Sequence, residues 1–243
     1  MFAMAGRHII TGLLLAAALF SCSAEKPAPP ATKAQPTVVV KPRRPVLTPE
    51  QRTELRFPAD IITKVEQAAG SEAEPFFITV SVPSENLKGE KEFEREKLAG
   101  FSVRTNKTAE LIASFRAGLR VRGYLIFRSR KSYGTLPDFA TVVKGNNSYD
   151  ILKIQGTEAA SYQLDTKAII VWLKARQKQG AFVITGAGAD WLEARFIKPP
   201  ANMLPFARNI CAFAPDVLEH GPGTVQKLAE RMKKTNEFSL VWD

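Results

Sequence analysis

Residues 181–197 read AFVITGAGADWLEARFI, and this stretch decides the fold class. Two short apolar segments, Ala181–Thr185 and Trp191–Ile197, flank a turn that carries two glycines and an aspartate. The pattern predicts two adjacent strands in a hairpin, because glycine supplies the backbone freedom that tight turns need. Strands joined by so short a turn are antiparallel. The sheet that contains them is therefore at least partly antiparallel.

Helix and strand signals alternate on either side of this hairpin. Thr48-Pro49-Glu50-Gln51 is typical of a helix start, with a capping threonine and proline at the first helical position. Further helices are predicted at Ala59–Ala69, Thr108–Val121, Asp165–Gln179, Asn202–Phe213 and Val225–Lys234, and a short exposed one within Ser84–Ala99. Further strands are predicted at Pro75–Val82, Tyr124–Ser129, Phe139–Lys144, Tyr149–Gln155 and Phe238–Trp242. We therefore expect an α+β fold, a single globular domain with a mixed, largely antiparallel sheet flanked by helices.

The first 21 residues carry an export signal. Arg7 precedes an apolar run from Ile9 to Phe20, and small residues follow. A basic start, a short apolar segment and a small-residue cleavage site describe a secretory signal peptide. The apolar run is shorter than the ~20 residues that a membrane-spanning helix needs.

The segment Leu19-Phe20-Ser21-Cys22 resembles the lipobox of bacterial lipoproteins. That resemblance implies diacylglycerol on the Cys22 thiol, cleavage before Cys22 and acylation of the new amine. It also implies a protein anchored by lipid to a membrane of the cell envelope. Ser23 stands where an aspartate typically retains lipoproteins at the inner membrane, which favours the outer membrane in a Gram-negative cell. A signal peptide cleaved elsewhere, without lipid, is the alternative.

Residues 22–47 are predicted to be a tether between this anchor and a globular part at 48–243. The segment contains six prolines: Pro27, Pro29, Pro30, Pro36, Pro42 and Pro45. Proline-rich chain is extended and semi-rigid. The globular part can therefore stand away from the bilayer.

Cysteine and histidine usage excludes several classes of site. The chain has two cysteines and two histidines, and Cys22 and His8 lie at or before the predicted cleavage site. Cys211 then has no disulfide partner within the chain, and its apolar surroundings predict an inert, buried thiol. His220 alone cannot build a zinc site of several histidines. We expect no metal and no cofactor.

An ordered set of short motifs spans the C-terminal part. The set comprises Tyr149-Asp150-Ile151-Leu152, Gly156-Thr157, Tyr162, Leu164-Asp165-Thr166, Thr185-Gly186-Ala187-Gly188, Asp190-Trp191, Pro199-Pro200, Ala212-Phe213, Pro215-Asp216-Val217, Gly221, Gly223-Thr224-Val225 and Trp242-Asp243. Over residues 132–243 the chain resembles the bacterial domain of unknown function 4253 family. Glu158-Ala159-Ala160-Ser161 stands where that family often has Asn-Gly-Ala-Asn. The resemblance implies a domain and supplies no mechanism.

Two groups of polar residues are candidates for a site. Asp190 and Glu193, beside Trp191, form an acid/base pair only if Asp190 belongs to the turn; the alternative is a half-exposed strand with its charges in water. Asp216, Glu219 and His220 lie within one helical turn, and the alternative there is a polar loop between helices. The glycines at 186 and 188 do not form a dinucleotide-binding loop, because a strand follows them instead of a helix.

One segment is strongly basic. Residues 111–136 contain six arginines and lysines and no acidic residue, in a chain of net charge +10. Arg116 and Arg120 are one helical turn apart, and Arg128 and Arg130 project from one face of the following strand. The four form either a patch for phosphate, lipid head groups or an acidic protein, or a solvated face.

These observations favour a lipid-anchored envelope protein that acts as a binding module and is not an enzyme. Its partners would be the membrane, through Cys22, and an anionic envelope component or an acidic protein. Nucleic acid is not expected, since no nucleic-acid-binding motif is present. The alternatives are a hydrolase-like envelope enzyme that uses carboxylates around Asp190 and Asp216, and an immunity-type protein that blocks a toxin.

Overall fold

The computed structural model describes residues 45–83 and 92–243, which lie within one compact unit, Arg43–Asp243. The predicted signal peptide, Cys22 and most of the predicted tether therefore fall outside the described residues. The described part is an α+β fold built on one seven-stranded mixed sheet, as the sequence predicts. Its strands are β1 (Glu74–Pro83), β2 (Glu92–Thr105), β3 (Tyr124–Arg130), β4 (Asp138–Lys144), β5 (Ala181–Ala187), β6 (Trp191–Lys198) and β7 (Glu237–Val241).

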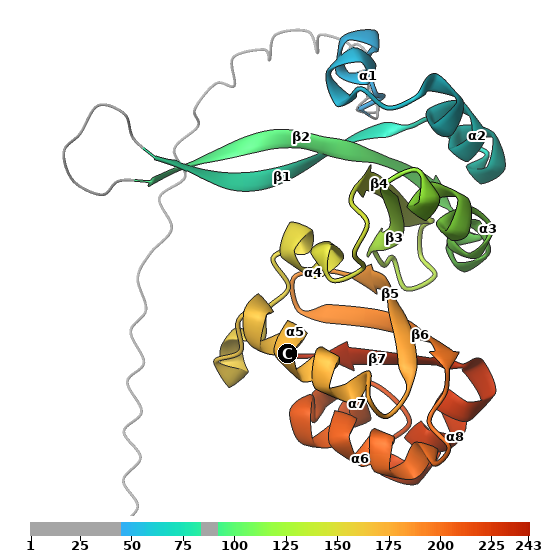
Figure 1. Ribbon diagram of the computed structural model, residues 1–243, viewed down its shortest axis with the longest axis vertical. Helices are drawn as coiled ribbons and strands as arrows, with labels where there is room; N and C mark the ends of the chain where they lie inside the picture. The colour runs from blue at the N-terminus through green and yellow to red at the C-terminus, as the bar shows by residue number, and fades with distance from the viewer. Residues whose placement is uncertain (1–44, 84–91) are drawn as a thin grey trace, which may run out of the picture. The chain divides into compact units, whose positions relative to one another are not determined.

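The strands follow the order β1-β2-β4-β3-β5-β6-β7 (Figure 1). Every neighbouring pair is antiparallel except β3 and β5, which are parallel. The register between those two strands joins only Arg128 and Gly186. The two halves of the sheet thus meet through very little backbone pairing.

Short-range sequence signals determine where several of the helices begin and end. The helices are α1 (Pro49–Leu55), α2 (Ala59–Ala69), α3 (Thr108–Val121), α4 (Asp150–Gln155), α5 (Thr166–Arg176), α6 (Met203–Phe213), α7 (Asp216–Glu219) and α8 (Val225–Thr235). Thr48 forms the predicted capping box with Gln51, and Asp165 caps α5. Gly70 ends α2 in the left-handed conformation, where glycine is favoured.

Two predictions for local structure are wrong. Tyr149–Gln155 was expected to be a strand, and it forms α4, which places Ile151 and Leu152 in the core. A short apolar run fits either element, so periodicity alone does not separate them. The second is the exposed helix within Ser84–Ala99: residues 92–99 belong to β2, and residues 84–91 are outside the described part.

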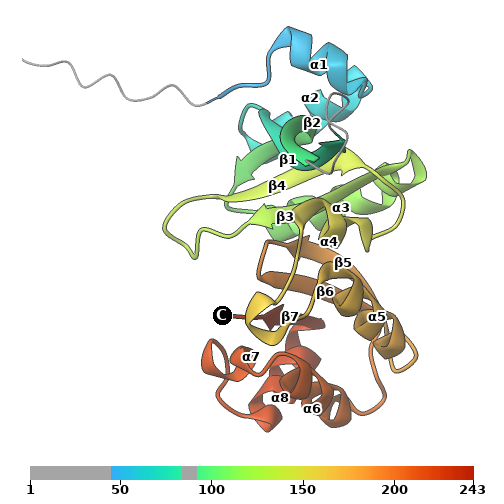
Figure 2. The same cartoon turned by 90° about the vertical axis from the view of Figure 1, so that its left-hand side faces the viewer.

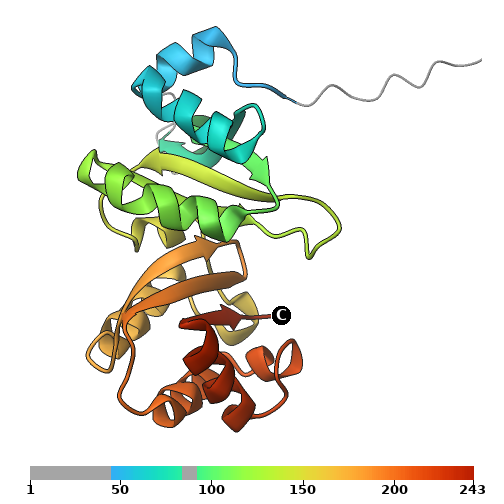
Figure 3. The ribbon, with the colours of Figure 1, turned by 90° about the vertical axis from the view of Figure 1, so that its right-hand side faces the viewer.

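Two hydrophobic clusters lie on opposite faces of the sheet. Along β3, Ile126 joins the cluster formed with α1, α2 and α3, whereas Leu125 and Phe127 join the cluster formed with α4, α5, α6 and α8. Figures 2 and 3 view the molecule from opposite sides, with α4 and α5 in front in Figure 2 and α3 in front in Figure 3. No described helix is long and apolar enough to cross a membrane.

The two faces of β6 differ sharply. Leu192, Ala194 and Phe196 point into the second of these clusters. Trp191, Glu193 and Arg195 point to the other face, on the side of the sheet where α3 lies. Because α3 packs mainly on β3, most of this face of β6 and β7 remains open enough to form a hollow.

Candidate functional site

A hollow of about 680 Å³ lies on this face of β6 and β7. We call it the sheet-face hollow; its volume is in the range of small-molecule sites. The β3–β4 loop forms one wall, and α8 with the α7–α8 loop forms the other. Its lining includes Arg128, Lys131, Tyr133, Asp138, Asp190, Trp191, Glu193, His220, Arg231, Met232, Ser239, Val241 and Asp243. Four residues of the two predicted polar groups thus share one hollow, namely Asp190, Trp191, Glu193 and His220, whereas Asp216 and Glu219 do not line it.

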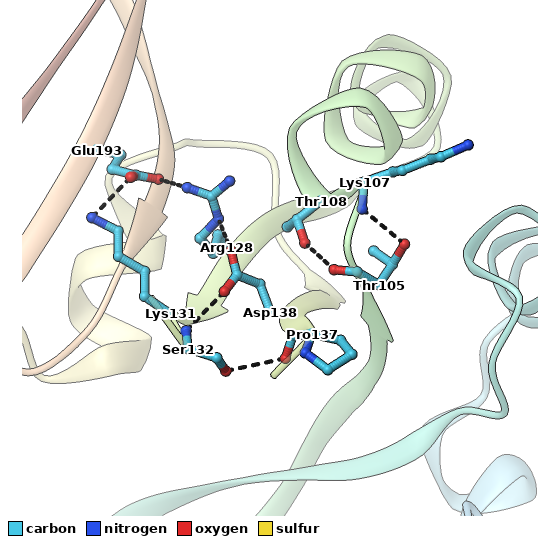
Figure 4. A network of polar contacts seen from close by, with 9 residues as sticks. All are labelled: Thr105, Lys107, Thr108, Arg128, Lys131, Ser132, Pro137, Asp138 and Glu193. Atoms are coloured by element: carbon cyan, nitrogen blue, oxygen red, sulfur yellow. Dashed lines mark hydrogen bonds and ion pairs between the residues drawn. The ribbon is translucent and has the colours of Figure 1, made fainter. Parts of the chain in front are cut away.

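A network of ion pairs crosses the base of this hollow (Figure 4). Glu193 Oε2 accepts a hydrogen bond from Arg128 Nη1 at 2.7 Å, and Glu193 Oε1 lies 2.8 Å from Lys131 Nζ. Arg128 Nε is 3.1 Å from Asp138 Oδ2, although this Nε–H makes no hydrogen bond within the described part of the chain. We treat that contact as an ion pair without a hydrogen bond. The four side chains are 17–24% exposed, so water screens these charges only partly.

The simpler interpretation of the sequence, a half-exposed strand residue with its charge in water, is therefore wrong for Glu193. Glu193 holds two cations and joins β6 to β3 and to the β3–β4 loop. Asp190 lies in the turn, as its predicted pairing with Glu193 requires, and is exposed at the rim. The two carboxylates line the same hollow, but only Asp190 is free of a side-chain partner among the described residues.

Trp191 is closely packed and is mostly buried. Lys131 Nζ lies 4.1 Å from the ring centroid, a cation–π contact. The indole also lies against Gly188, where an added Cβ would fall 2.2 Å from Nε1. The side chain is 8% exposed.

The glycine-rich turn is a hairpin, as predicted, but the reason for its glycines is different. Neither Gly186 nor Gly188 has a positive φ. At Gly188 close approach excludes a side chain, because an added Cβ would overlap Trp191. At Gly186 the approach is tight but less severe, because an added Cβ would lie 3.0 Å from Arg128 Cβ. The turn is also tied to the fold by Thr157 Oγ1, which donates to the Gly188 carbonyl at 2.7 Å.

Asp216 belongs to a separate polar cluster beside the hollow. Its carboxylate accepts a hydrogen bond from the Tyr162 hydroxyl at 2.6 Å and another from the Asp243 backbone N–H at 2.8 Å. The hydrogen bond to Asp216 raises the pKa of Tyr162 to about 12, and the same bond lowers the pKa of Asp216. Asp216 thus connects α7 to the end of β7 and to the turn at 160–162.

His220 follows the one-turn helix α7, where the sequence suggested a polar loop. Its Nε2 lies 3.3 Å from Asp243 Oδ2, at the rim of the hollow. Within the described residues, no group of three or more His, Cys, Asp or Glu is arranged to hold a metal ion. Burial raises the pKa of the Cys211 thiol, which disfavours the reactive thiolate. The contacts of Tyr162 and Asp243 with Asp216 could not be predicted from the sequence, because they form between elements far apart in the chain.

The four predicted arginines do not act alike. Arg116 lines a small cavity of about 30 Å³ between α3 and β6, which Arg128 also lines. The Arg128 guanidinium is already paired with Glu193 and Asp138. Arg130 lies over the Phe139 ring at 4.8 Å. The structure therefore does not present all four as one free patch.

A different cationic group replaces the predicted one. Arg116 and Arg120 lie on one side of α3, and Arg195 of β6 lines the same small cavity as Arg116. Burial lowers the pKa of Arg116, and the charges of Arg195 and Arg120 lower it further. In the described ranges neither Arg116 nor Arg120 forms an ion pair, and Arg195 reaches Glu237 only at 3.8 Å. We call Arg116, Arg120 and Arg195 the arginine cluster.

The cavity at the arginine cluster lies next to the sheet-face hollow. Arg128, Glu193 and Glu237 line both spaces. Arg195 was not predicted to belong to a basic site, because it lies far along the chain from the basic segment at 111–136.

Comparison with known proteins places a family match on the C-terminal part of the chain. Residues 140–243 match the model of a family described as Domain of unknown function (DUF4253). Neither the curated proteins nor the solved structures gave a match. The matched part contributes Glu193, Arg195 and His220 to the site, whereas Arg116, Arg128 and Lys131 precede it.

Proposed function

We propose that this chain is a lipid-anchored protein of the bacterial cell envelope whose globular part binds an anionic ligand at the arginine cluster. The observation that carries the binding role is that Arg116 and Arg195 line one cavity, with Arg120 one helical turn from Arg116. Both carboxylates that line this cavity already have cationic partners: Glu193 pairs with Arg128 and Lys131, and Glu237 lies 3.8 Å from Arg195. Like charges gathered in this way destabilise the unliganded protein, and an anion would relieve the repulsion. Guanidinium groups also match the geometry of phosphate and carboxylate.

The arrangement supports binding more than hydrolysis. Glu193 already serves Arg128 and Lys131, and Asp216 already accepts two hydrogen bonds. Asp190 is the one carboxylate of the three without a side-chain partner among the described residues, and it is exposed at the rim. A general base needs a carboxylate within reach of the proton that it removes and able to take it. The hollow next to the cluster instead offers room for the body of a ligand whose anionic group is held by the arginines.

Removal of the arginine cluster is expected to abolish anion binding. The test compares Arg116→Gln/Arg120→Gln/Arg195→Gln with Lys227→Gln/Lys233→Gln/Lys234→Gln, which removes three exposed charges from α8. Binding of inorganic phosphate and of phosphatidylglycerol vesicles is measured by titration with the folded state verified by circular dichroism. We expect the arginine variant to lose at least about tenfold in affinity, equivalent to 1.4 kcal/mol, and the lysine variant to change little.

The two probes separate the possible sources of the anionic group. Binding of phosphate alone indicates a soluble ligand, and binding of vesicles alone indicates a lipid head group. Binding of either probe should weaken as the salt concentration rises, because the Debye length falls from ~10 Å at 0.1 M to ~3 Å at 1 M. Equal loss of binding in both variants would mean that only net charge matters, and the proposed site would be wrong.

The anchor itself is tested at Cys22. Wild-type protein is expected in the detergent phase of a phase-separation experiment, because three acyl chains exceed the two signals that stable anchoring needs. Cys22→Ser is expected to remain uncleaved or to move to the aqueous phase. Mass spectrometry of wild-type protein that found a soluble, unlipidated chain would contradict the anchor.

A further inference from the structure

β1 and β2 extend beyond the body of the sheet as a two-stranded ribbon (Figure 1). β2 pairs with β4 only from Gly100 to Thr105. Beyond that region, Ile78–Pro83 pairs with Glu92–Lys97 and with no other described strand. A two-stranded ribbon is marginal in water, and a further strand would stabilise it.

Among the described residues, no strand covers the outer edge of β1, which is therefore open to a further strand. β1 is the first strand of the sheet, and the described backbone hydrogen bonds of Glu74–Pro83 all go to β2. From residue 77 to residue 82 the sequence is FITVSV, which holds no charge, proline or glycine. Natural edge strands normally carry such residues to prevent pairing with another chain. Within this stretch β1 lacks that protection.

The charges of the ribbon lie on β2, one strand away from this edge. Lys97 pairs with Ile78 and Arg95 with Val80, so one face is apolar and basic. Glu96 pairs with Thr79 and Glu94 with Ser81, so the other face carries hydroxyls and acids. Two β1 strands can therefore meet without placing like charges directly opposite each other.

We propose that β1 pairs antiparallel with β1 of a second copy of this chain, through a twofold axis near Thr79. In this register Ile78 lies opposite Val80 of the second copy, and Thr79 lies opposite Thr79 of the second copy. The apolar, basic face of one ribbon therefore continues into the apolar, basic face of the other, and the face with hydroxyls and acids does the same. The partner is a second copy because the uncharged edge matches itself under this symmetry. The inference is independent of the anionic ligand.

Thr79→Lys separates pairing from folding. In the single ribbon, the new lysine lies opposite Glu96 and gains a favourable partner. In the dimer, it faces the same lysine of the second copy, a destabilising arrangement. Val121→Lys on α3 is the matched control, since Val121 is an apolar residue that is 90% exposed and receives the same charge.

Sedimentation of the full chain in detergent gives the association constant. We expect a dimer for the wild type and for Val121→Lys, and association at least about tenfold weaker for Thr79→Lys, a difference of 1.4 kcal/mol. Wild-type protein that is monomeric at every concentration would overturn the proposal. So would equal association of the two lysine variants.

Cysteine cross-linking tests the register. In the Cys211→Ser background, Thr79→Cys is expected to form a covalent dimer on mild oxidation, because side chains directly opposite place their Cβ atoms ~4.5–5.5 Å apart. The Cys211→Ser variant alone shows how much covalent dimer forms through Cys22. Val121→Cys in the same background shows how much forms by random collision of exposed thiols. A covalent dimer no more abundant than in these two controls would overturn the twofold pairing at Thr79.

Discussion

Residues 140–243 alone are expected to remain unfolded, although they include the whole family match. In the sheet, β3 lies between β4 and β5, so this fragment leaves both strands without the neighbour that joins them. β3 also supplies Leu125 and Phe127 to the core, at 7% and 0% exposure. Loss of one buried phenylalanine side chain costs about 3–5 kcal/mol, against a total stability of about 5–15 kcal/mol for a typical domain. The fragment therefore lacks the core that its own strands need.

Tryptophan fluorescence reports this outcome directly. Trp172, Trp191 and Trp242 all lie within the fragment, and Trp191 and Trp242 are buried in the folded protein. We expect red-shifted emission and no cooperative thermal transition for residues 140–243. Residues 43–243 are the control and should give buried tryptophan emission and one cooperative transition. A cooperative transition of the short fragment would show that β3 is dispensable.

The elements that sequence reasoning predicted well are those with local causes. The Thr48 capping box, the Gly70 stop and the helical spacing over Thr108–Val121 each depend on residues a few positions apart. The hairpin around 181–197 is local in the same sense. Such features need no knowledge of what packs against them.

The features that sequence reasoning missed depend on distant partners. The parallel neighbours β3 and β5 are joined through Arg128 and Gly186, and no local pattern marks that pairing. The apolar pattern of Tyr149–Gln155 fits both a helix and a strand. The segment forms a helix, which buries Ile151 and Leu152 in the core. Tertiary packing overrides weak local preference in short segments.

The candidate site shows the same division. Asp190, Trp191 and Glu193 were found together because one hairpin carries them. The role of Glu193 was not predictable, since Arg128 and Lys131 reach it only after β3 has been placed beside β5. Because β3 lies beside β5, Arg128 pairs with Glu193 and is not free to belong to the predicted patch. Arg195 of β6 lines the same cavity as Arg116 and so belongs to the arginine cluster.

Replacement of Glu193 by alanine is expected to be strongly destabilising. The variant leaves Arg128 and Lys131 without their shared carboxylate, while Asp138 remains beside Arg128 only. Breaking a buried ion pair costs about 3–5 kcal/mol, and the partial exposure of these side chains reduces the expected loss to about 2–4 kcal/mol. Chemical denaturation of residues 43–243 measures the change in free energy of unfolding.

Glu237→Ala is the matched control on the adjacent strand. Glu237 is 48% exposed and reaches Arg195 at 3.8 Å, so its loss should cost no more than about 1 kcal/mol. The difference between the two variants measures what the network contributes where the sheet has little backbone pairing. If Glu193→Ala costs no more than Glu237→Ala, then packing of Leu125 and Phe127 holds the two halves together, and the ion pairs only fill the space beneath the hollow.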